Sequence, residues 1–173
     1  MSKYKDETQY WIKEFIVRHN ICPFAEQVLS KISYTVCSAQ NPEVILEKLV
    51  ETIQTLLNEN PQKVATAFLI LPKWDHNEFE DFCNLVGDAE DLLATLAIED
   101  EVQLVAFHPR FHFAGESPDD VTNAVNQSPH AMIHLLRSEE VATAVDSELG
   151  GEAISLRNKN YLRRLGNKAL LRK

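Results

Sequence analysis

The sequence predicts a helix-rich α/β sandwich with a small, mainly parallel sheet of about three strands. Residues 64–71, VATAFLIL, form a nearly continuous apolar run, which is typical of a strand covered on both faces. Two further strand candidates, residues 34–37 and 102–107, are separated from this run by single amphipathic helical patterns. Helical connections of this kind fit crossovers between neighbouring parallel strands, with the helices on the faces of the sheet.

Composition favours one α/β domain over residues 1–166, followed by a basic tail at 167–173. The 173 residues are 45% apolar, and a chain of this size buries roughly 70% of its unfolded surface, so it needs neither a disulfide nor a metal to fold. The three cysteines are widely spaced and odd in number, which suits a reducing compartment. Neither a signal-peptide core nor an apolar run of roughly 18 residues occurs. We therefore expect a cytoplasmic protein with no membrane contact.

The net charge of −9 is unevenly distributed along the chain. Positions 157–173 carry seven Lys/Arg and no acid, so residues 1–156 carry the remaining −16. The simplest interpretation is that the basic end packs on the acidic body or is solvated. Nucleic acid is disfavoured as a partner, because the body repels phosphates and the sequence has no RNA-binding aromatic motif or zinc-finger spacing.

Helix signals occur before, between and after the strand candidates. Trp11 and Phe15 lie at helical spacing in the first pattern, and Pro23 ends it and can start a short second helix. Asn41 followed by Pro42 is an N-cap and first-turn pair. The main helices are therefore expected at about residues 7–20, 23–29, 41–58, 75–97, 138–148 and 157–165.

Capping signals add detail to the second half of the chain. Asp75 with Glu78 forms a capping-box-like start for the helix that follows. Ser117-Pro118 and Ser128-Pro129 each resemble a cap with a first-turn proline, so they predict two short helices after the strand at 102–107. Gly150 and Gly151 are expected to end the helix that begins near residue 138.

Residues 107–137, FHPRFHFAGESPDDVTNAVNQSPHAMIHLLR, are the strongest candidate for a functional site. They hold four of the six histidines and two arginines, Arg110 and Arg137, together with acidic and amide side chains. His108 directly follows a strand, and ligand groups collect beyond the carboxyl ends of parallel strands. The local alternative is that the histidines satisfy backbone acceptors and that the arginines form internal salt bridges with nearby carboxylates.

The histidines also allow a metal hypothesis. His130 and His134 have H-x-x-x-H spacing, which on a helix places both imidazoles on one face. A third ligand would have to come from elsewhere, with His108, His112, Asp119 or Asp120 available. On the same expected helix, His134 and Arg137 lie one turn apart and can converge. Because helical histidines are common without a metal, we assign no resident metal or cofactor.

Cys22 is a separate candidate because Pro23 can begin a helix immediately after it. The positive end of a helix dipole favours thiolate, so Cys22 could act as a nucleophile beside His108 or His134. The alternative is a small hydrophobic side chain that closes a helix junction.

Three segments resemble one known family. NICPFAEQV at residues 20–28, the motif at 107–137 and SLRNKNYLRRLG at 155–166 are similar to the bacterial family called domain of unknown function 1415. The resemblance runs from the first helix to about Gly166, and His112 and His130 depart from the family pattern. It supplies no established activity. It implies that one polar site contains His108, Asp120, Asn123, Asn126, His134, Arg137 and Asn158.

These features lead to three hypotheses. The first is a pocket for a small anionic ligand, because Arg110 and Arg137 are the only Lys/Arg residues between positions 74 and 156 and guanidinium groups suit carboxylate or phosphate. If that pocket is catalytic, His108 or His134 would be the general acid or base, Asp120 would orient it and Cys22 would be the nucleophile, as in a hydrolase or acyl-transfer enzyme. The second is a non-enzymatic structural or interaction protein with a buried polar network. The third is a metal-dependent hydrolase.

Overall fold

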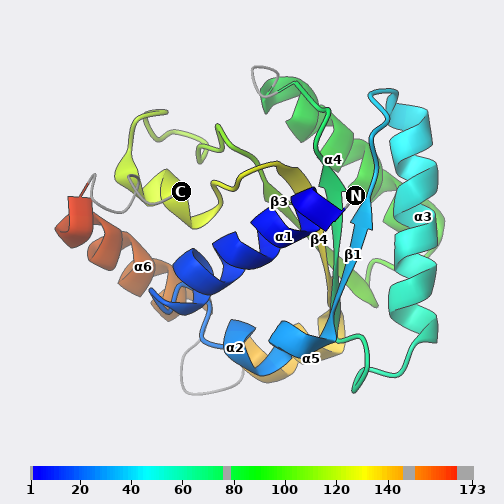
Figure 1. Cartoon of the computed structure of the whole chain (residues 1–173), viewed down its shortest axis with the longest axis horizontal. Helices are drawn as coiled ribbons and strands as arrows, with labels where there is room; N and C mark the ends of the chain where they lie inside the picture. The colour runs from blue at the N-terminus through cyan, green and yellow to red at the C-terminus, as the bar shows by residue number, and fades with distance from the viewer. Residues whose placement is uncertain (1, 76–78, 146–150, 167–173) are drawn as a thin grey trace.

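The computed structural model describes residues 2–75, 79–145 and 151–166. Its described part is a mixed α/β fold around a four-stranded sheet in the order β1-β2-β4-β3 (Figure 1). The strands are β1 (Ile32–Val36), β2 (Thr66–Leu71), β3 (Val102–Phe107) and β4 (Ala131–Arg137). β1 is parallel to β2, whereas β4 is antiparallel to both of its neighbours, β2 and β3. The three predicted strands, β1, β2 and β3, therefore all exist and run in one direction. The fourth strand, β4, lies between β2 and β3 and runs in the opposite direction.

The prediction of a mainly parallel, three-stranded sheet is wrong because residues 131–137 form a strand and not the expected helix. Ser128 does not cap a helix, since its hydroxyl donates to the carbonyl of His130 (2.6 Å). β4 is an inner strand, and Ala131, Met132 and Ile133 are fully buried. An inner strand is apolar on both faces, so its periodicity does not distinguish it from a buried helix.

Two helices cover one face of the sheet and form the first core. α3 (Pro42–Asn58) connects β1 to β2, and α4 (Phe79–Thr95) leads from β2 toward β3 (Figure 1). As predicted, Asn41 is the N-cap of α3, and its side chain accepts hydrogen bonds from the N–H groups of Glu43 and Val44. Side chains such as Leu49, Leu69 and Ile133 pack between these helices and the sheet.

The second core covers the other face. α1 (Ser2–Trp11) continues as a π-helical segment, η1 (Ile12–Val17), and Asn20 then adopts a positive φ of 52°. The 3-10 helix η3 (Val121–Val125) and α6 (Gly151–Leu165) complete this layer. Trp11, Phe68 and Met132 are buried in this core. Helices therefore lie on both faces of the sheet, as the sequence predicts.

The remaining elements are short or differ from expectation. They are α2 (Ala25–Val28), η2 (Leu29–Lys31) and α5 (Ser138–Val145). The helix expected after Ser117 is η3, and Asp120 is its cap. Gly151 begins α6 and does not end the preceding helix, whereas Glu78, Gly150 and the tail at 167–173 lie outside the described residues. Among the helices described, none is long and apolar enough to cross a membrane.

Candidate functional site

Asn123 organises the segment that leads from β3 to β4. Its side chain is fully buried, and its Oδ1 accepts a hydrogen bond from the N–H of Phe113 (3.1 Å). Its Nδ2 donates to the carbonyls of Ser117 (2.8 Å) and Pro118 (3.3 Å). One amide side chain therefore provides hydrogen-bond partners for backbone groups of Phe113, Ser117 and Pro118. Buried polar groups of a loop need such partners.

His108 and Asn126 continue this network at the end of β3. The Asn126 side chain donates to the carbonyl of Ala106 (3.0 Å), and its own carbonyl accepts from the N–H of His108 (3.1 Å). The His108 imidazole is fully buried, and its Nδ1 accepts from the N–H of Arg110 (3.1 Å). The ring packs against Phe79 and Phe82, with both ring centroids 5.2 Å away. His108 thus faces α4 and the first core, while the side chain of Arg110 is exposed.

Asp120 contacts Thr122 and not a histidine. Its Oδ1 accepts from the Thr122 hydroxyl (2.6 Å) and from the Thr122 N–H (2.8 Å). These two bonds lower the pKa of the Asp120 carboxyl, and the positive charges of Arg163 and Lys159 on α6 lower it further. Asp120 therefore caps the helix η3. The basic side chains of α6 lie close enough to the loop before η3 to stabilise the charge of this carboxylate.

Replacing Thr122 with valine should raise the pKa of the Asp120 carboxyl toward its ordinary value. Valine keeps the shape of threonine but cannot donate, so the largest cause of the lowered pKa disappears. Carboxyl chemical shifts followed by NMR across acidic pH measure this change. Thr55→Val is the control, because the Thr55 hydroxyl donates to a carbonyl within α3. An Asp120 titration that is the same in Thr122→Val and in the original protein would contradict this assignment.

His134 lies in the middle of β4 on the face of the second core. Its ring stacks on Phe68 with centroids 4.0 Å apart and an interplanar angle of 2°. Its Nε2 is 2.6 Å from the hydroxyl oxygen of Thr66, and that hydroxyl donates to the carbonyl of Leu135. Nε2 must therefore carry the hydrogen and donate to Thr66. Burial lowers the pKa of His134 to about 3, so the imidazole is neutral near pH 7.

Arg137 lies far from His108 and on the opposite face from His134. Its guanidinium Nη2 donates to the carbonyls of Leu56 and Glu59 (2.8 Å) at the end of α3 and of Val64 (3.3 Å) just before β2. In the sheet, Arg137 pairs with Val102 at the start of β3, whereas His108 follows the end of that strand. Side chains three positions apart on a strand point to opposite faces. The predicted convergence of His134 and Arg137 across one helical turn is therefore wrong.

The helical H-x-x-x-H arrangement is also wrong, because His130 precedes β4 and His134 lies within it. The Nε2 of His130 is 2.7 Å from a carboxylate oxygen of Glu7, and its ring meets the edge of Tyr4. Within the described residues, no three His, Cys, Asp or Glu side chains form a group that could hold a metal ion.

Cys22 and Asn158 lie together at the junction between η1 and α2. Asn158 is buried, its side chain donates to the carbonyl of Ile21 (2.7 Å), and its Oδ1 accepts from Arg157 (2.9 Å). The Cys22 side chain is exposed, and α2 begins only at Ala25 and spans four residues. Ile21 belongs to the second core, whereas His108 faces the first core. The structure therefore does not bring Cys22 to His108.

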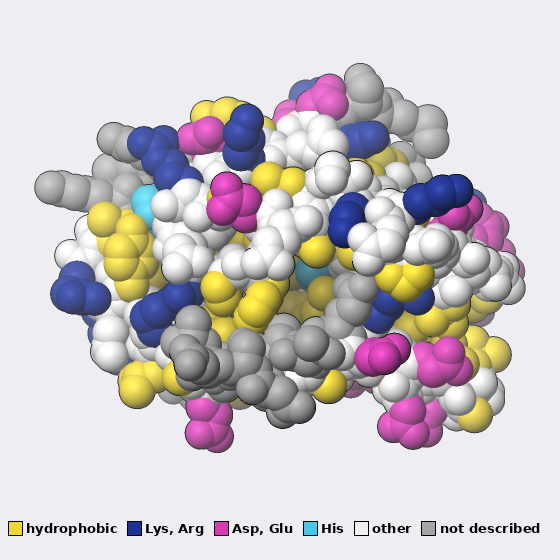
Figure 2. Space-filling model, turned by 90° about the horizontal axis from the view of Figure 1, so that it is seen from below, with side chains coloured by type: hydrophobic (Ala, Val, Ile, Leu, Met, Phe, Trp, Pro, Cys, Tyr) yellow, Lys and Arg dark blue, Asp and Glu magenta, His cyan; other side chains and the backbone are white. Residues whose placement is uncertain are grey.

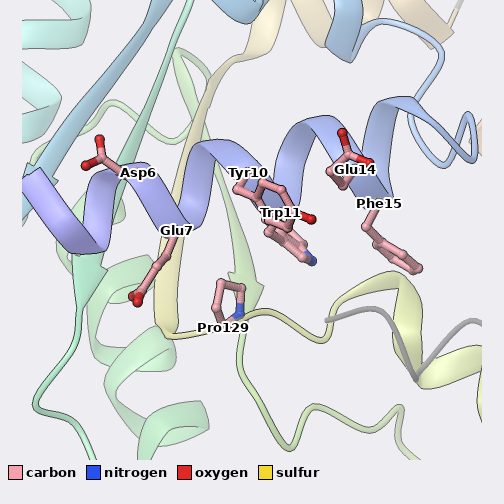
Figure 3. A pocket seen from close by; sticks show the side chains of 7 residues that line it. All are labelled: Asp6, Glu7, Tyr10, Trp11, Glu14, Phe15 and Pro129. Atoms are coloured by element: carbon pink, nitrogen blue, oxygen red, sulfur yellow. The ribbon is translucent and has the colours of Figure 1, made fainter.

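A groove of about 470 Å³ lies beside α1, and Pro129 of the predicted segment 107–137 is among its lining residues (Figure 3). Tyr10, Trp11 and Phe15 line it from α1 and η1, and Pro129 lines it from the segment before β4. The carboxylates of Asp6, Glu7 and Glu14 also line it. The helix thus presents aromatic rings and acidic groups to one space that is in the size range of small-molecule sites.

A family described as proteins of unknown function, DUF1415, matches residues 3–172, nearly the whole chain. The chain belongs to the DUF1415 family. No curated protein and no solved structure matches it. The resemblance to DUF1415 drawn from the three sequence segments is therefore confirmed.

The polar residues of these DUF1415 segments have a common bonding pattern. Asn123, Asn126, Arg137 and Asn158 each donate to backbone carbonyls of the chain itself. The predicted site residues are thus divided among the loop before β4, the end of α3 and the junction after η1. The described structure does not bring these side chains together as the single polar site that the sequence predicts, and their hydrogen bonds are made to separate parts of the backbone.

Sequence reasoning missed the groove of this DUF1415 protein. Trp11 and Phe15 had been interpreted only as the apolar stripe of the first helix. Glu7, Tyr10 and Glu14 recur at helical spacing on the same stretch, and this alternation of acidic and aromatic residues is the signal that could have indicated a binding surface. The sequence could not have identified Pro129 as a lining residue of the groove, because its position beside α1 depends on the path of the loop before β4.

Proposed function

We propose that this DUF1415 protein acts by binding and not by catalysis, with the motif at 107–137 serving as an internal polar network that shapes the loop before β4. The observation that carries the proposal is the position of the two imidazoles, His108 and His134, on opposite faces of the sheet. Two groups separated by a packed sheet cannot act on one substrate atom.

The bonding of the motif supports the same conclusion. A connection as long as residues 108–130, with only the short helix η3 inside it, needs its own anchors to hold one conformation. Asn123 and Asn126 provide such anchors through hydrogen bonds to Ser117, Phe113 and Ala106. Leaving a buried polar group unpaired costs about 1–3 kcal/mol, so these side chains have a sufficient structural reason to be present.

The pKa of His134 and the positions of Asp120 and Cys22 also argue against catalysis by these residues. A general base works best with a pKa near the working pH, whereas the pKa of His134 is lowered to about 3. The bonds of the Asp120 carboxylate are made to Thr122. A nucleophilic cysteine needs a base within hydrogen-bond reach, and Cys22 follows a residue of the second core while His108 lies over the first.

Replacing Asn123 with alanine should lower the free energy of unfolding by about 2 kcal/mol, because it leaves the Phe113 N–H without its partner and removes the hydrogen bonds to the Ser117 and Pro118 carbonyls. Urea unfolding followed by circular dichroism measures the loss. Asn84→Ala is the matched control, since Asn84 is exposed on α4 and alanine favours helix there.

Thermal unfolding with added phosphate, sulfate and small dicarboxylates distinguishes this proposal from the anionic-ligand hypothesis. We expect no saturable stabilisation that depends on the motif. The opposite result would be one of these anions raising the melting temperature, with His134→Ala and Arg137→Ala abolishing that effect while remaining as stable as the original protein. That outcome would overturn the structural role and restore a ligand pocket in the motif.

A further inference from the structure

The groove beside α1 has an apolar floor made of rings. Trp11 and Phe15 are buried against the second core, while Tyr10 on the same helix is 64% exposed. Pro129 closes the space from the other side (Figure 3). Rings and a proline offer flat apolar contact, so the floor suits a planar apolar body better than a strongly hydrated one.

The charges around this floor are negative. The Asp6 carboxylate makes no ion pair or hydrogen bond with any described residue. Glu14 pairs with Arg18 (3.0 Å), and Glu7 contacts His130 (2.7 Å) and, at 3.8 Å, Lys3. The described lining of the groove thus includes three carboxylates and no lysine or arginine, and the first 156 residues as a whole carry −16. Cations are attracted both to carboxylates and to the faces of aromatic rings.

Trp11 supplies an independent observation. Its side chain is only 5% exposed, and among the described residues its indole Nε1 has no hydrogen-bond partner. In Figure 3 the indole nitrogen points away from the helix, toward the space between Pro129 and Phe15. Buried donors are almost always paired, so an unpaired one beside a groove indicates that a ligand atom accepts its hydrogen bond.

We propose that the groove binds a small organic cation, a protonated amine joined to a flat apolar body that carries a hydrogen-bond acceptor. The flat body lies on Tyr10, Trp11 and Phe15, and the ammonium group faces the carboxylate of Asp6, for which no described residue provides an ion pair. The acceptor receives the Nε1–H of Trp11. This inference names a ligand class for the binding role proposed above, and its failure would leave the structural role of the motif at 107–137 unaffected.

Three probes with the same ring test the assignment: 2-(4-methoxyphenyl)ethylamine, the corresponding neutral alcohol and the corresponding carboxylate. The chain has two tryptophans, so an amide–proton NMR spectrum shows two indole N–H signals. Trp74 packs in the first core and is the internal control. We expect the amine to shift the Trp11 signal saturably and leave that of Trp74 in place, with the alcohol binding at least about tenfold more weakly and the carboxylate weakest.

Variants connect the binding to the named groups. Asp6→Asn combined with Glu14→Gln should weaken the amine about tenfold and leave the alcohol unchanged, because only the amine loses a charge partner. Trp11→Phe removes both the donor and the indole signal, so its binding is followed by calorimetric titration, and it should bind both probes more weakly. The matched control is Asp91→Asn combined with Glu90→Gln, two exposed acids on α4, which should change neither.

Equal affinity for the three probes, or no saturable shift of the Trp11 signal, would overturn the proposal. The same is true if the acidic double variant binds the amine as the original protein does. A shift of the Trp11 signal with protein concentration and no probe would identify a second copy of the chain as the occupant. A shift on truncation after Gly166 would identify residues 167–173 as the occupant. Either of these two results would also overturn the proposal that the groove binds a small organic cation.

Discussion

Replacing Arg137 with alanine should lower the free energy of unfolding by about 3 kcal/mol. The guanidinium group donates to three backbone carbonyls, those of Leu56 and Glu59 at the end of α3 and that of Val64 just before β2. The Leu56 and Glu59 carbonyls lie at the negative end of the helix dipole, so the substitution removes both hydrogen bonds and a favourable charge. Chemical denaturation monitored by tryptophan fluorescence measures the loss.

Two further variants make this result specific. Arg137→Lys keeps the positive charge but cannot present a planar group to several carbonyls, so we expect about half the loss. Arg164→Ala is the matched control, because Arg164 is exposed on α6 and, among the described residues, donates only to a carbonyl of its own helix at 3.4 Å. It should change the stability by less than about 0.5 kcal/mol. An Arg137→Ala protein as stable as the original would show that the arginine is available for another role.

The second large effect is a loss of stability in acid that depends on His134. In the unfolded chain this histidine has its ordinary pKa of 6.5, whereas burial in the folded protein lowers the pKa to about 3. Between these values the unfolded state binds a proton that the folded state does not, so acid favours unfolding. The contribution of His134 is fully present above pH 6.5 and is lost progressively as the pH falls toward 3. The slope is at most about 1.4 kcal/mol per pH unit.

Urea unfolding at several pH values between 7 and 4 tests this dependence. In His134→Gln the free energy of unfolding should decline less steeply with acid than in the original protein. His134→Phe retains a flat ring over Phe68 and should show the same shallower slope, even if its stability at pH 7 differs. Identical slopes in all three proteins would mean that His134 is protonated equally easily in the folded and unfolded states.

The secondary structure was predictable where the signals are local. The Asn41 cap, the apolar strand β2 and the strand β3 were placed correctly, because each depends on residues adjacent in the chain. β4 was not, because an apolar segment after Ser128-Pro129 satisfies a helix pattern and an inner-strand pattern equally well. The pairing of β4 with β2 and β3 is a non-local contact, and it decided between the two.

That one assignment also decided the candidate site. On a helix, His134 and Arg137 share a face, whereas on a strand they point to opposite faces. The partners of the site residues are equally non-local: Arg137 reaches the carbonyl of Glu59, Asn158 reaches that of Ile21, and His130 reaches Glu7. The residue types alone show that these side chains can form strong hydrogen bonds, but they do not show with which atoms.

The sequence by itself determined that this is an α/β protein with helices on both faces of a sheet, that residues 107–137 contain many polar and titratable side chains, and that the chain resembles DUF1415. Apolar periodicity, capping residues and motif similarity are properties of neighbouring residues, so they need no coordinates. Only the tertiary structure decided the direction of β4, the separation of His108 from His134, and the presence of Pro129 beside Trp11. These depend on how distant segments pack, because a side chain's partners are set by the face and edge on which the folded chain places it.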